Sequence, residues 1–336
     1  MAAMPDTMPR PKRPRVIVTR QLMPAVEARM AELFEVVLSA QDHAFSRDEL
    51  MAAVADCDVL VPTVTDRIDA DILAAAGPRL RLIANFGAGV DHIDLSAARA
   101  KAIMVANTPG VFTEDTADMT MALILSVPRR LAEGEKLMRS GAWAGWAPSA
   151  MLGHRVGGKL LGIVGMGRIG LAVARRARAF GLSIHYHNRR RLPADVEAEL
   201  GASFHPSIDT LLRIADIVTL HCPHTAETHG LISAARIAAM KPTAYLINTA
   251  RGEVVDEDAL IGALTNRRIA GAGLDVYNHE PAVDPRLLGL DNVVLLPHLG
   301  SATVEGREAS GERVIANIRA WCDGHRPMAQ VIEGWA

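Results

Sequence analysis

Short apolar runs alternate with longer alanine-rich segments along most of this chain, and this alternation restricts the fold more than any other feature. From position 15 onward, VIVTR, EVVLS and DVLVPT are separated by helix-like stretches at 23–33 and 47–55, and LRLIANFG and AIMVANTPG continue the series. A second series begins at KLLGIV and runs through SIHYHN, IADIVTLHCP, AYLINTA, IAGAGLDVY and NVVLLPH. Such alternation predicts β-α-β units, and therefore parallel sheets covered by helices.

Two series of strands predict two domains. The chain has 336 residues, of which 49% are apolar, and this is enough for two ordinary cores. We expect an α/β protein with two Rossmann-like, doubly wound parallel-sheet domains and a cleft between them. Residues 15–107, completed by 301–336, are expected to form one domain, and residues 108–300 the other. The basic, proline-rich residues 1–14 are expected to form a disordered tail.

Two further segments are predicted around the border between the domains. Residues 113–139 contain few helix breakers and predict one long helix, which the glycine- and tryptophan-rich GAWAGWAPSAMLGHRVGG follows as a connection. Residues 301–322 have helical periodicity, and we expect this helix to pack back on the first domain.

Composition excludes several classes of function. With 36 basic and 38 acidic residues, the chain has no overall attraction for nucleic acid or anionic lipid. Its longest apolar stretches, such as MALILSV, are too short to span a membrane. Three cysteines far apart in sequence argue against a disulfide framework and indicate the reducing cytoplasm. The histidine-rich segments HYH and HCPH lack further ligands at metal-site spacing, so no metal is expected.

The sequence Gly165-Met166-Gly167-Arg168-Ile169-Gly170 follows the apolar run LLGIV and opens the helix-like LAVARRARAF. In this strand-turn-helix context it is typical of a dinucleotide site. The first glycine allows the tight turn, the second lets a pyrophosphate approach the backbone, and the third lets the helix lie close to the strand. A glycine-rich turn without a ligand is the alternative. We expect the cofactor to contact Gly165, Met166, Gly167, Arg168 and Ile169.

The strand after the fingerprint ends without the carboxylate that usually binds the adenosine ribose of NAD. Asn188 stands there, 18 positions past Gly170, followed by Arg189, Arg190 and Arg191. A carboxylate would repel a 2′-phosphate, whereas an amide can donate to it and a guanidinium can pair with it. One charge-assisted hydrogen bond contributes about 1.5–3 kcal/mol. The sequence therefore predicts NADP(H) in preference to NAD(H), bound by Asn188, Arg189 and Arg190; a solvated basic loop is the alternative.

Three later segments each place a polar residue at a predicted strand end: NTARGEVVDEDAL, AGLDVYNHEP and LLPHLGSAT. Alone, Arg251 could be an ion-pair partner, Glu280 a loop acid and His298 a core histidine. Together, in this order and downstream of the fingerprint, they make the chain resemble the D-isomer-specific 2-hydroxyacid dehydrogenase family. The resemblance extends from NFGAGVDHID, which begins at Asn85, to LPHLGSAT, and is closest to the NADPH-preferring glyoxylate and hydroxypyruvate reductases.

The resemblance implies the reduction of a 2-keto acid, which needs a hydride on the carbonyl carbon and a proton on its oxygen. It assigns the acid/base role to His298, because histidine exchanges protons near neutral pH. Glu280 matches the carboxylate that orients the imidazole and favours its protonated form. Arg251 matches the guanidinium that binds the substrate carboxylate and polarises the carbonyl.

The resemblance also assigns binding positions in both domains. The backbone N–H groups of Ala88 and Gly89, in the first domain, are expected to bind the substrate carboxylate. Asp275 is matched to the partner of the nicotinamide carboxamide. The positions expected to line the cofactor are Thr116, His221, Cys222, Pro223, Thr249, Ala250, Asp275 and Gly300.

Departures from related enzymes narrow the substrate. Formate dehydrogenases have glutamine at the position of Glu280, and phosphite dehydrogenases have lysine at the position of Ala88. Phosphoglycerate dehydrogenases commonly add a regulatory domain, for which this chain has no room. We therefore expect glyoxylate and hydroxypyruvate to be reduced to D-2-hydroxy acids with NADPH. A dehydrogenase for bulkier 2-keto acids and a non-catalytic dinucleotide-sensing protein remain as alternatives.

Trp143 and Trp146 lie in the connecting segment GAWAGWAP. Tryptophans in such positions are more often packing anchors than substrate contacts. In the family that the chain resembles, however, the corresponding segment crosses a two-fold interface, which implies a homodimer.

Overall fold

The computed structural model describes residues 10–332, which divide into two compact units. Unit 1 consists of residues 10–112 and 303–332, and unit 2 of residues 113–302. The borders predicted from the sequence lay at 107/108 and 300/301. Positions 1–9 of the predicted tail lie outside the described residues. At Arg10 the guanidinium donates to the carbonyl oxygen of Trp321 at 2.6 Å.

Unit 1 contains a five-stranded sheet in the order β2-β1-β3-β4-β5, and every neighbouring pair is parallel. The strands are rich in valine, isoleucine and leucine, which suit a sheet buried on both faces. Strand order reverses direction between β1 and β3, as in doubly wound folds. The strands are β1 (Arg15–Val18), β2 (Glu35–Val37), β3 (Val59–Val61), β4 (Leu82–Ala84) and β5 (Met104–Ala106).

Helices cover both faces of the unit 1 sheet, because alternate residues of each strand point to opposite sides. Val16 and Val18 pack with residues of α1 and α13 in one core, and Ile17 packs with residues of α2, α3 and α4 in the other. Helix α13 belongs to this unit although it follows unit 2 in sequence. The helices are α1 (Pro24–Leu33), α2 (Arg47–Asp56), α3 (Ala70–Ala74), α4 (Leu95–Ala100) and α13 (Val304–Cys322).

Unit 2 contains a seven-stranded parallel sheet in the order β12-β11-β10-β9-β6-β7-β8. From the middle the chain adds strands first on one side and then on the other, so the order reverses between β6 and β9. Open α/β sheets bind ligands beyond the strand ends at this reversal. The strands are β6 (Leu160–Val164), β7 (Ser183–His187), β8 (Ser203–Phe204), β9 (Ile217–Leu220), β10 (Tyr245–Asn248), β11 (Gly271–Leu274) and β12 (Val293–Leu295).

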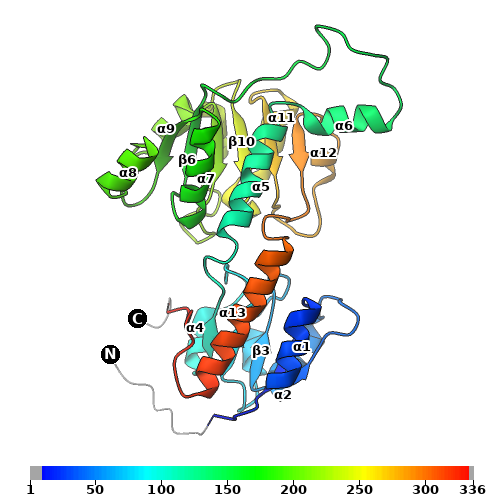
Figure 1. Cartoon of the computed structure of the whole chain (residues 1–336), viewed down its shortest axis with the longest axis vertical. Coiled ribbons are helices and arrows are strands. Elements are labelled where there is room, and N and C mark those ends of the chain that lie inside the picture. The colour runs from blue at the N-terminus through cyan, green and yellow to red at the C-terminus, as the bar shows by residue number, and fades with distance from the viewer. Residues whose placement is uncertain (1–9, 333–336) are drawn as a thin grey trace. The chain divides into compact units, whose positions relative to one another are not determined.

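Two apolar cores lie on opposite faces of the unit 2 sheet. Helices α5 and α7 pack side by side on one face (Figure 1), and α9, α10 and α11 pack on the other. The helices are α5 (Thr113–Ser126), α6 (Leu131–Arg139), α7 (Arg168–Ala179), α8 (Ala194–Leu200), α9 (Ile208–Ile214), α10 (Ala234–Ala239), the 3-10 helix η1 (Gly252–Val254), α11 (Glu257–Thr265) and α12 (Pro285–Leu288). The prediction of two Rossmann-like parallel-sheet domains is confirmed.

The single helix predicted over 113–139 is wrong. The structure has α5 and α6 in its place, separated by a turn that contains Pro128 and ends at Arg130, whose φ is 56°. Proline lacks the N–H that a helix interior needs, and the positive φ reverses the handedness of the backbone. Helix α6 has no buried residue, and Figure 1 shows the chain after it running as a long loop away from the sheet.

No helix among residues 10–332 combines the length and the apolar character that crossing a membrane would require.

Candidate active site

The strands of unit 2 are parallel, so their carboxyl ends meet at one edge of the sheet. The predicted residues of this unit follow these strand ends, apart from Thr116 on α5: Gly165–Ile169 after β6, Asn188–Arg190 after β7, His221–Pro223 after β9, Thr249–Arg251 after β10, Asp275 and Glu280 after β11, and His298 and Gly300 after β12. Ala88 and Gly89 follow β4 of unit 1.

The turn after β6 requires glycine at two places and is open at a third. Gly165 has φ +96°, and a Cβ there would lie 2.6 Å from the backbone nitrogen of Cys222. A Cβ on Gly170 would lie 2.4 Å from the Gly165 carbonyl oxygen, whereas a Cβ on Gly167 would meet nothing within 4 Å. Gly167 is the N-cap of α7, whose first N–H groups have no intrahelical acceptor. This backbone fits a pyrophosphate.

Asn188 ties this turn to the end of β7. Its side-chain oxygen accepts a hydrogen bond from the Met166 N–H at 2.6 Å. In the basic stretch that follows, Arg191 forms an ion pair with Glu197 at 2.8 Å. Arg189 and Arg190 are exposed, and neither makes a hydrogen bond or ion pair with the rest of residues 10–332. Two guanidinium groups are therefore available to an anion beside the glycine turn.

The segment after β9 presents neutral side chains. Nε2 of His221 lies 3.0 Å from the Thr219 hydroxyl, and burial lowers the pKa of His221 to about 3. Burial also raises the pKa of Cys222 to about 11, so its thiol stays protonated. In the described part of the chain, no group of three or more His, Cys, Asp or Glu residues is arranged to hold a metal.

Three buried threonines connect α5 to the loops after β10 and β12. The Thr116 hydroxyl donates to the Gly300 carbonyl at 3.0 Å, and the Thr120 hydroxyl donates to the Thr116 carbonyl at 2.7 Å. The hydroxyls of Thr120 and Thr249 lie 2.8 Å apart. Sequence reasoning missed Thr120, although its spacing of four from Thr116 places both on one face of the helix.

Asp275 fixes the loop that carries His298. This carboxylate is 1% exposed; its two oxygens accept from the N–H groups of Leu299 at 2.6 Å and Gly300 at 2.7 Å. The Asp275 carbonyl also accepts from the His298 N–H at 3.0 Å. Burial raises the pKa of Asp275, against the effect of these donors. The sequence did not indicate this role, because the contacts are to backbone groups more than twenty positions away.

His298 and Glu280 form the central pair. Nδ1 of His298 lies 2.7 Å from Oε2 of Glu280, and Oε1 of Glu280 accepts from the Tyr277 N–H at 3.0 Å. Burial opposes ionisation of Glu280, but the hydrogen bond and charge of His298 outweigh it, so the pKa of Glu280 is lowered. An ionised carboxylate can only accept a hydrogen bond, so Nδ1 of His298 carries the proton of this bond. Nε2 takes no part in the contact with Glu280 and is available to another group.

Arg251 sits on a segment that passes directly over the loop carrying Glu280. A Cβ on Gly252 would lie 2.1 Å from the carbonyl carbon of Tyr277, so only glycine permits this approach. The Asn248 side chain holds the segment, because its amide donates to the Arg251 carbonyl at 2.8 Å and its oxygen accepts from the Ala250 N–H at 3.0 Å. The charge of Arg251 contributes to lowering the pKa of Glu280. Sequence reasoning missed Asn248 and Gly252.

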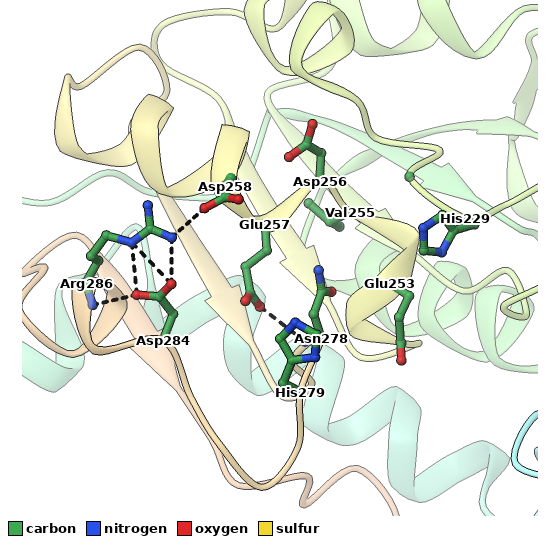
Figure 2. A pocket seen from close by; sticks show the side chains of 11 residues that line it. His229, Glu253, Val255, Asp256, Glu257, Asp258, Asn278, His279, Asp284 and Arg286 are labelled. Carbon is green, nitrogen blue, oxygen red and sulfur yellow. Dashed lines mark hydrogen bonds and ion pairs between the residues drawn. The ribbon is translucent and has the colours of Figure 1, made fainter.

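A cavity of about 430 Å³ lies beside these segments, and Arg251, Glu280 and His298 are not among its lining residues. Figure 2 shows Arg286 between Asp258 and Asp284, and Glu257 directed at the backbone of Asn278. Because five carboxylates line it, this cavity disfavours phosphate and 2-keto acids. Hydrogen bonds among the residues that line the cavity connect the 251–258 segment to the chain after β11. Its lining residues are His229, Gly230, Glu253, Val255, Asp256, Glu257, Asp258, Asn278, His279, Asp284 and Arg286.

In unit 1 the loop of Ala88 and Gly89 is shaped by two asparagines. Asn85 donates through its amide to the carbonyl of Gly89 at 2.8 Å, and Asn107 donates to that of Ala88 at 2.7 Å. The carbonyls are thus held by side chains, and within residues 10–332 the N–H groups of Ala88 and Gly89 donate no hydrogen bond. Successive free N–H groups form an anion-binding nest. Sequence reasoning did not identify Asn85 or Asn107 as the residues that hold this loop.

Comparison with known proteins places this geometry in context. Residues 121–300 match the family described as "D-isomer specific 2-hydroxyacid dehydrogenase, NAD binding domain". Glyoxylate reductase of Thermococcus onnurineus is 46% identical over 94% of this chain and 95% of its own, and that of Korarchaeum cryptofilum is 45% identical over the same shares. The solved structure of an NADPH-dependent glyoxylate/hydroxypyruvate reductase of Sinorhizobium meliloti, in complex with NADP and malonate, matches with a TM-score of 0.85. It is 38% identical, over 96% of this chain and 98% of its own.

Proposed function

The chain belongs to the D-isomer specific 2-hydroxyacid dehydrogenase family, and from this premise we propose that it reduces glyoxylate and hydroxypyruvate to D-2-hydroxy acids with NADPH. Membership makes it an oxidoreductase, and the glyoxylate reductases among its relatives support 2-keto acids as its substrates. The observation that carries the proposal is the 2.7 Å contact of His298 with Glu280, at the sheet edge that also carries Arg251 and the glycine turn.

In this proposal His298 transfers a proton between Nε2 and the oxygen of the substrate carbonyl. The Glu280 carboxylate accepts a hydrogen bond from the Nδ1–H of His298, fixes the plane of the imidazole and stabilises its protonated form. Asp275 holds the backbone on which His298 stands. NADPH, when bound, supplies the hydride to the carbonyl carbon.

Arg251 binds the substrate carboxylate and polarises the carbonyl. A guanidinium suits this role because its parallel N–H groups match the two oxygens of a carboxylate. Positive charge near the carbonyl oxygen also stabilises the negative charge that develops there during hydride transfer. The positions of Asn248 and Gly252 support this role, because they fix the backbone on both sides of Arg251.

The free N–H groups of Ala88 and Gly89 are assigned to the carboxylate of the substrate as well. Backbone donors cost no side-chain entropy on binding, and small residues leave them accessible. Asn85 and Asn107 support this assignment, because they occupy the carbonyl groups that would otherwise repel an anion.

The preference for NADPH is assigned to Arg189 and Arg190. Asn188 takes the place of a ribose-binding carboxylate, and its side-chain oxygen is already bonded to the Met166 N–H. The glycine turn with Arg168 and Ile169 is assigned to the pyrophosphate. Thr116, His221, Cys222, Pro223, Thr249, Ala250, Asp275 and Gly300 are assigned to the rest of the cofactor.

The direct test follows NADPH and NADH oxidation with glyoxylate, hydroxypyruvate, and a bulky aromatic or branched 2-keto acid. We expect kcat/KM to be highest for the two small acids with NADPH. Faster turnover of the bulky acids would instead identify the enzyme as a dehydrogenase for bulkier 2-keto acids. Tight cofactor binding with no oxidation by any 2-keto acid would identify a dinucleotide-sensing protein instead.

We also propose a homodimer formed through residues 131–152. This segment exposes large apolar side chains on α6 and the loop after it, and such patches are uncommon on monomers. Light scattering should give twice the mass of one chain, and Trp146→Glu should shift it to the monomer. The exposed fractions are 53% for Leu131, 59% for Met138, 53% for Trp143, 83% for Trp146 and 66% for Leu152.

A reducing cytoplasm is the proposed location. Cys57, Cys222 and Cys322 are all unpaired in the structure. Burial raises the pKa of Cys57 to about 12 and that of Cys322 to about 11, so both stay as thiols. Free thiols are typical of proteins kept in reducing compartments.

A further inference from the structure

The basic loop after β7 is held at both of its ends. At its start, Asn188 accepts the Met166 N–H at 2.6 Å. At its end, the Leu192 N–H donates to the Tyr186 hydroxyl at 2.9 Å, and Arg191 donates to Glu197. Between these points, Arg189 and Arg190 are exposed and make no hydrogen bond or ion pair among residues 10–332. The Thr225 hydrogen bond and, to a smaller extent, the charge of Arg189 lower the pKa of Glu227.

The anchor at the end of the loop is a closed network inside unit 2. Tyr186 is fully buried, Glu197 is 8% exposed, and the Tyr186 hydroxyl donates to Oε1 of Glu197 at 2.6 Å. Nε and Nη2 of Arg191 contact the two oxygens of Glu197 at 2.9 and 2.8 Å, so the pair is bidentate. The hydrogen bond from Arg191, followed by that from Tyr186, lowers the pKa of Glu197. Glu197 therefore stays charged.

Arg191 binds Glu197 through Nε and Nη2, while its side chain stays 65% exposed. Its guanidinium also lies over the ring of Phe204, at 5.9 Å from the centroid. A guanidinium held by a carboxylate fork and an aromatic face has little tendency to turn to another anion. The three arginines that follow one another in sequence thus divide into one that anchors the loop and two that remain available.

We infer that Tyr186, Glu197 and Arg191 act as a clamp that positions Arg189 and Arg190 on the 2′-phosphate, and thereby sets the selectivity for NADPH over NADH. The inference rests on the proposed preference for NADPH. The three are positioning residues, because they act through the loop. Because the clamp orders the loop when the protein folds, no further ordering of the loop is needed when the cofactor binds. The loop is proposed to contact the 2′-phosphate, so the clamp increases the affinity for NADPH and not for NADH.

The test measures dissociation constants of NADPH and NADH by calorimetry. Arg191→Lys keeps the positive charge but loses the fork to Glu197, and Tyr186→Phe removes the hydroxyl that joins Glu197 to Leu192. In both variants we expect the NADPH/NADH selectivity to fall roughly three- to tenfold, which corresponds to the cost of ordering one mobile side chain when the cofactor binds. NADH affinity and kcat with saturating NADH should not change.

Arg175→Lys is the matched control, because Arg175 is also exposed and pairs with a carboxylate of α8, that of Glu199, at 3.1 Å. This variant should leave selectivity unchanged. A thermal midpoint within a few degrees of the wild type shows that each variant is folded. Unchanged selectivity in both Arg191→Lys and Tyr186→Phe would overturn the clamp. A loss in Arg191→Lys alone would make Arg191 itself a phosphate ligand, which also overturns it.

A double-mutant cycle separates this inference from the proposed function. Arg189→Ala/Arg190→Ala should abolish the preference for NADPH, and Tyr186→Phe should have no further effect on selectivity in that background. An equal effect of Tyr186→Phe in both backgrounds would show that it acts elsewhere, and would overturn the clamp while leaving the proposed cofactor preference intact. Unchanged selectivity in the double variant would instead contradict the proposed preference, and the clamp with it.

Discussion

Nδ1 of His298 lies 2.7 Å from Oε2 of Glu280, although the two residues are 18 positions apart and follow different strands. Strands β11 and β12 are parallel neighbours, so the loops after them meet at the same edge of the sheet. The Asp275 carboxylate then fixes the loop of His298, and the Tyr277 N–H fixes the carboxylate of Glu280. This pair is the basis of the first two predictions.

Replacing His298 by Asn should remove most of the turnover and leave cofactor binding intact. Asparagine cannot exchange the proton, and loss of a general acid reduces kcat about 10²- to 10⁴-fold. The dissociation constant of NADPH should stay within about twofold, because the backbone of this loop is held by Asp275. Steady-state kinetics with glyoxylate and a calorimetric titration measure the two effects. Near-normal turnover would contradict the acid/base role.

Replacing Glu280 by Gln should move the alkaline limb of the pH profile to lower pH. The anionic carboxylate stabilises the protonated imidazole beside it, and the neutral amide does not. Because the pKa of Glu280 is lowered, its charge persists throughout the neutral range and is lost only as the pH falls through that lowered value. The profile of kcat/KM against pH tests this shift. An alkaline limb at the same pH in both enzymes would show that Glu280 does not influence proton transfer.

Arg251→Ala should raise the KM for the 2-keto acid and lower kcat together. Removal of a charged hydrogen-bonding group costs about 1.5–3 kcal/mol, roughly a factor of ten to a hundred. Arg251→Lys is the matched variant, because lysine keeps the positive charge but cannot bind a carboxylate with two parallel N–H groups. Its KM and kcat should lie between those of the wild type and those of Arg251→Ala. An unchanged KM in the alanine variant would rule out binding of the substrate carboxylate by Arg251.

Two alanine substitutions in the glycine turn should have opposite consequences. At Gly167 a Cβ meets nothing within 4 Å, so the variant should be as stable as the wild type but bind both cofactors weakly, because the methyl group occupies the approach of the pyrophosphate. At Gly170 a Cβ would lie 2.4 Å from a backbone oxygen, so that variant should lose stability. Thermal unfolding and cofactor titration of both variants distinguish them. Normal cofactor affinity in Gly167→Ala would exclude binding at this turn.

Glu49 makes the stability of unit 1 depend on pH in acid. Its carboxylate accepts from the Ser46 backbone and lies 2.9 Å from Nε2 of His43; these contacts lower the pKa of Glu49 to about 2. A lowered pKa contributes stability that is fully present above the unfolded value, about 4.3 for Glu, and is lost as the pH falls to about 2. Glu49→Gln keeps the capping box without the charge. As the pH is lowered, the thermal midpoint of this variant should therefore fall less steeply than that of the wild type. Parallel curves of thermal midpoint against pH for the two proteins would refute this account.

Local patterns in the sequence were sufficient for much of the fold and for the chemical types at the site. Strand periodicity predicted both parallel sheets, and the spacing of Gly165, Gly167 and Gly170 predicted the turn, because these signals depend on neighbouring residues. The prediction of one helix over 113–139 was wrong because it also depended on neighbouring residues alone. The segment has helical composition on both sides of Pro128, so the proline alone did not distinguish a kink from a break, and the left-handed backbone at Arg130 shows that the chain turns there.

By itself the sequence determined which residue stands at the end of each strand, since alternation and turn chemistry are local properties of the chain. Only the tertiary structure decided which of those residues are held by a partner and which remain available to a ligand. Whether Arg191 or Arg189 is free depends on Glu197, and whether Thr249 is held depends on Thr120 in α5. Such contacts join segments distant in sequence, and they exist only after strand order and helix packing have placed those segments side by side.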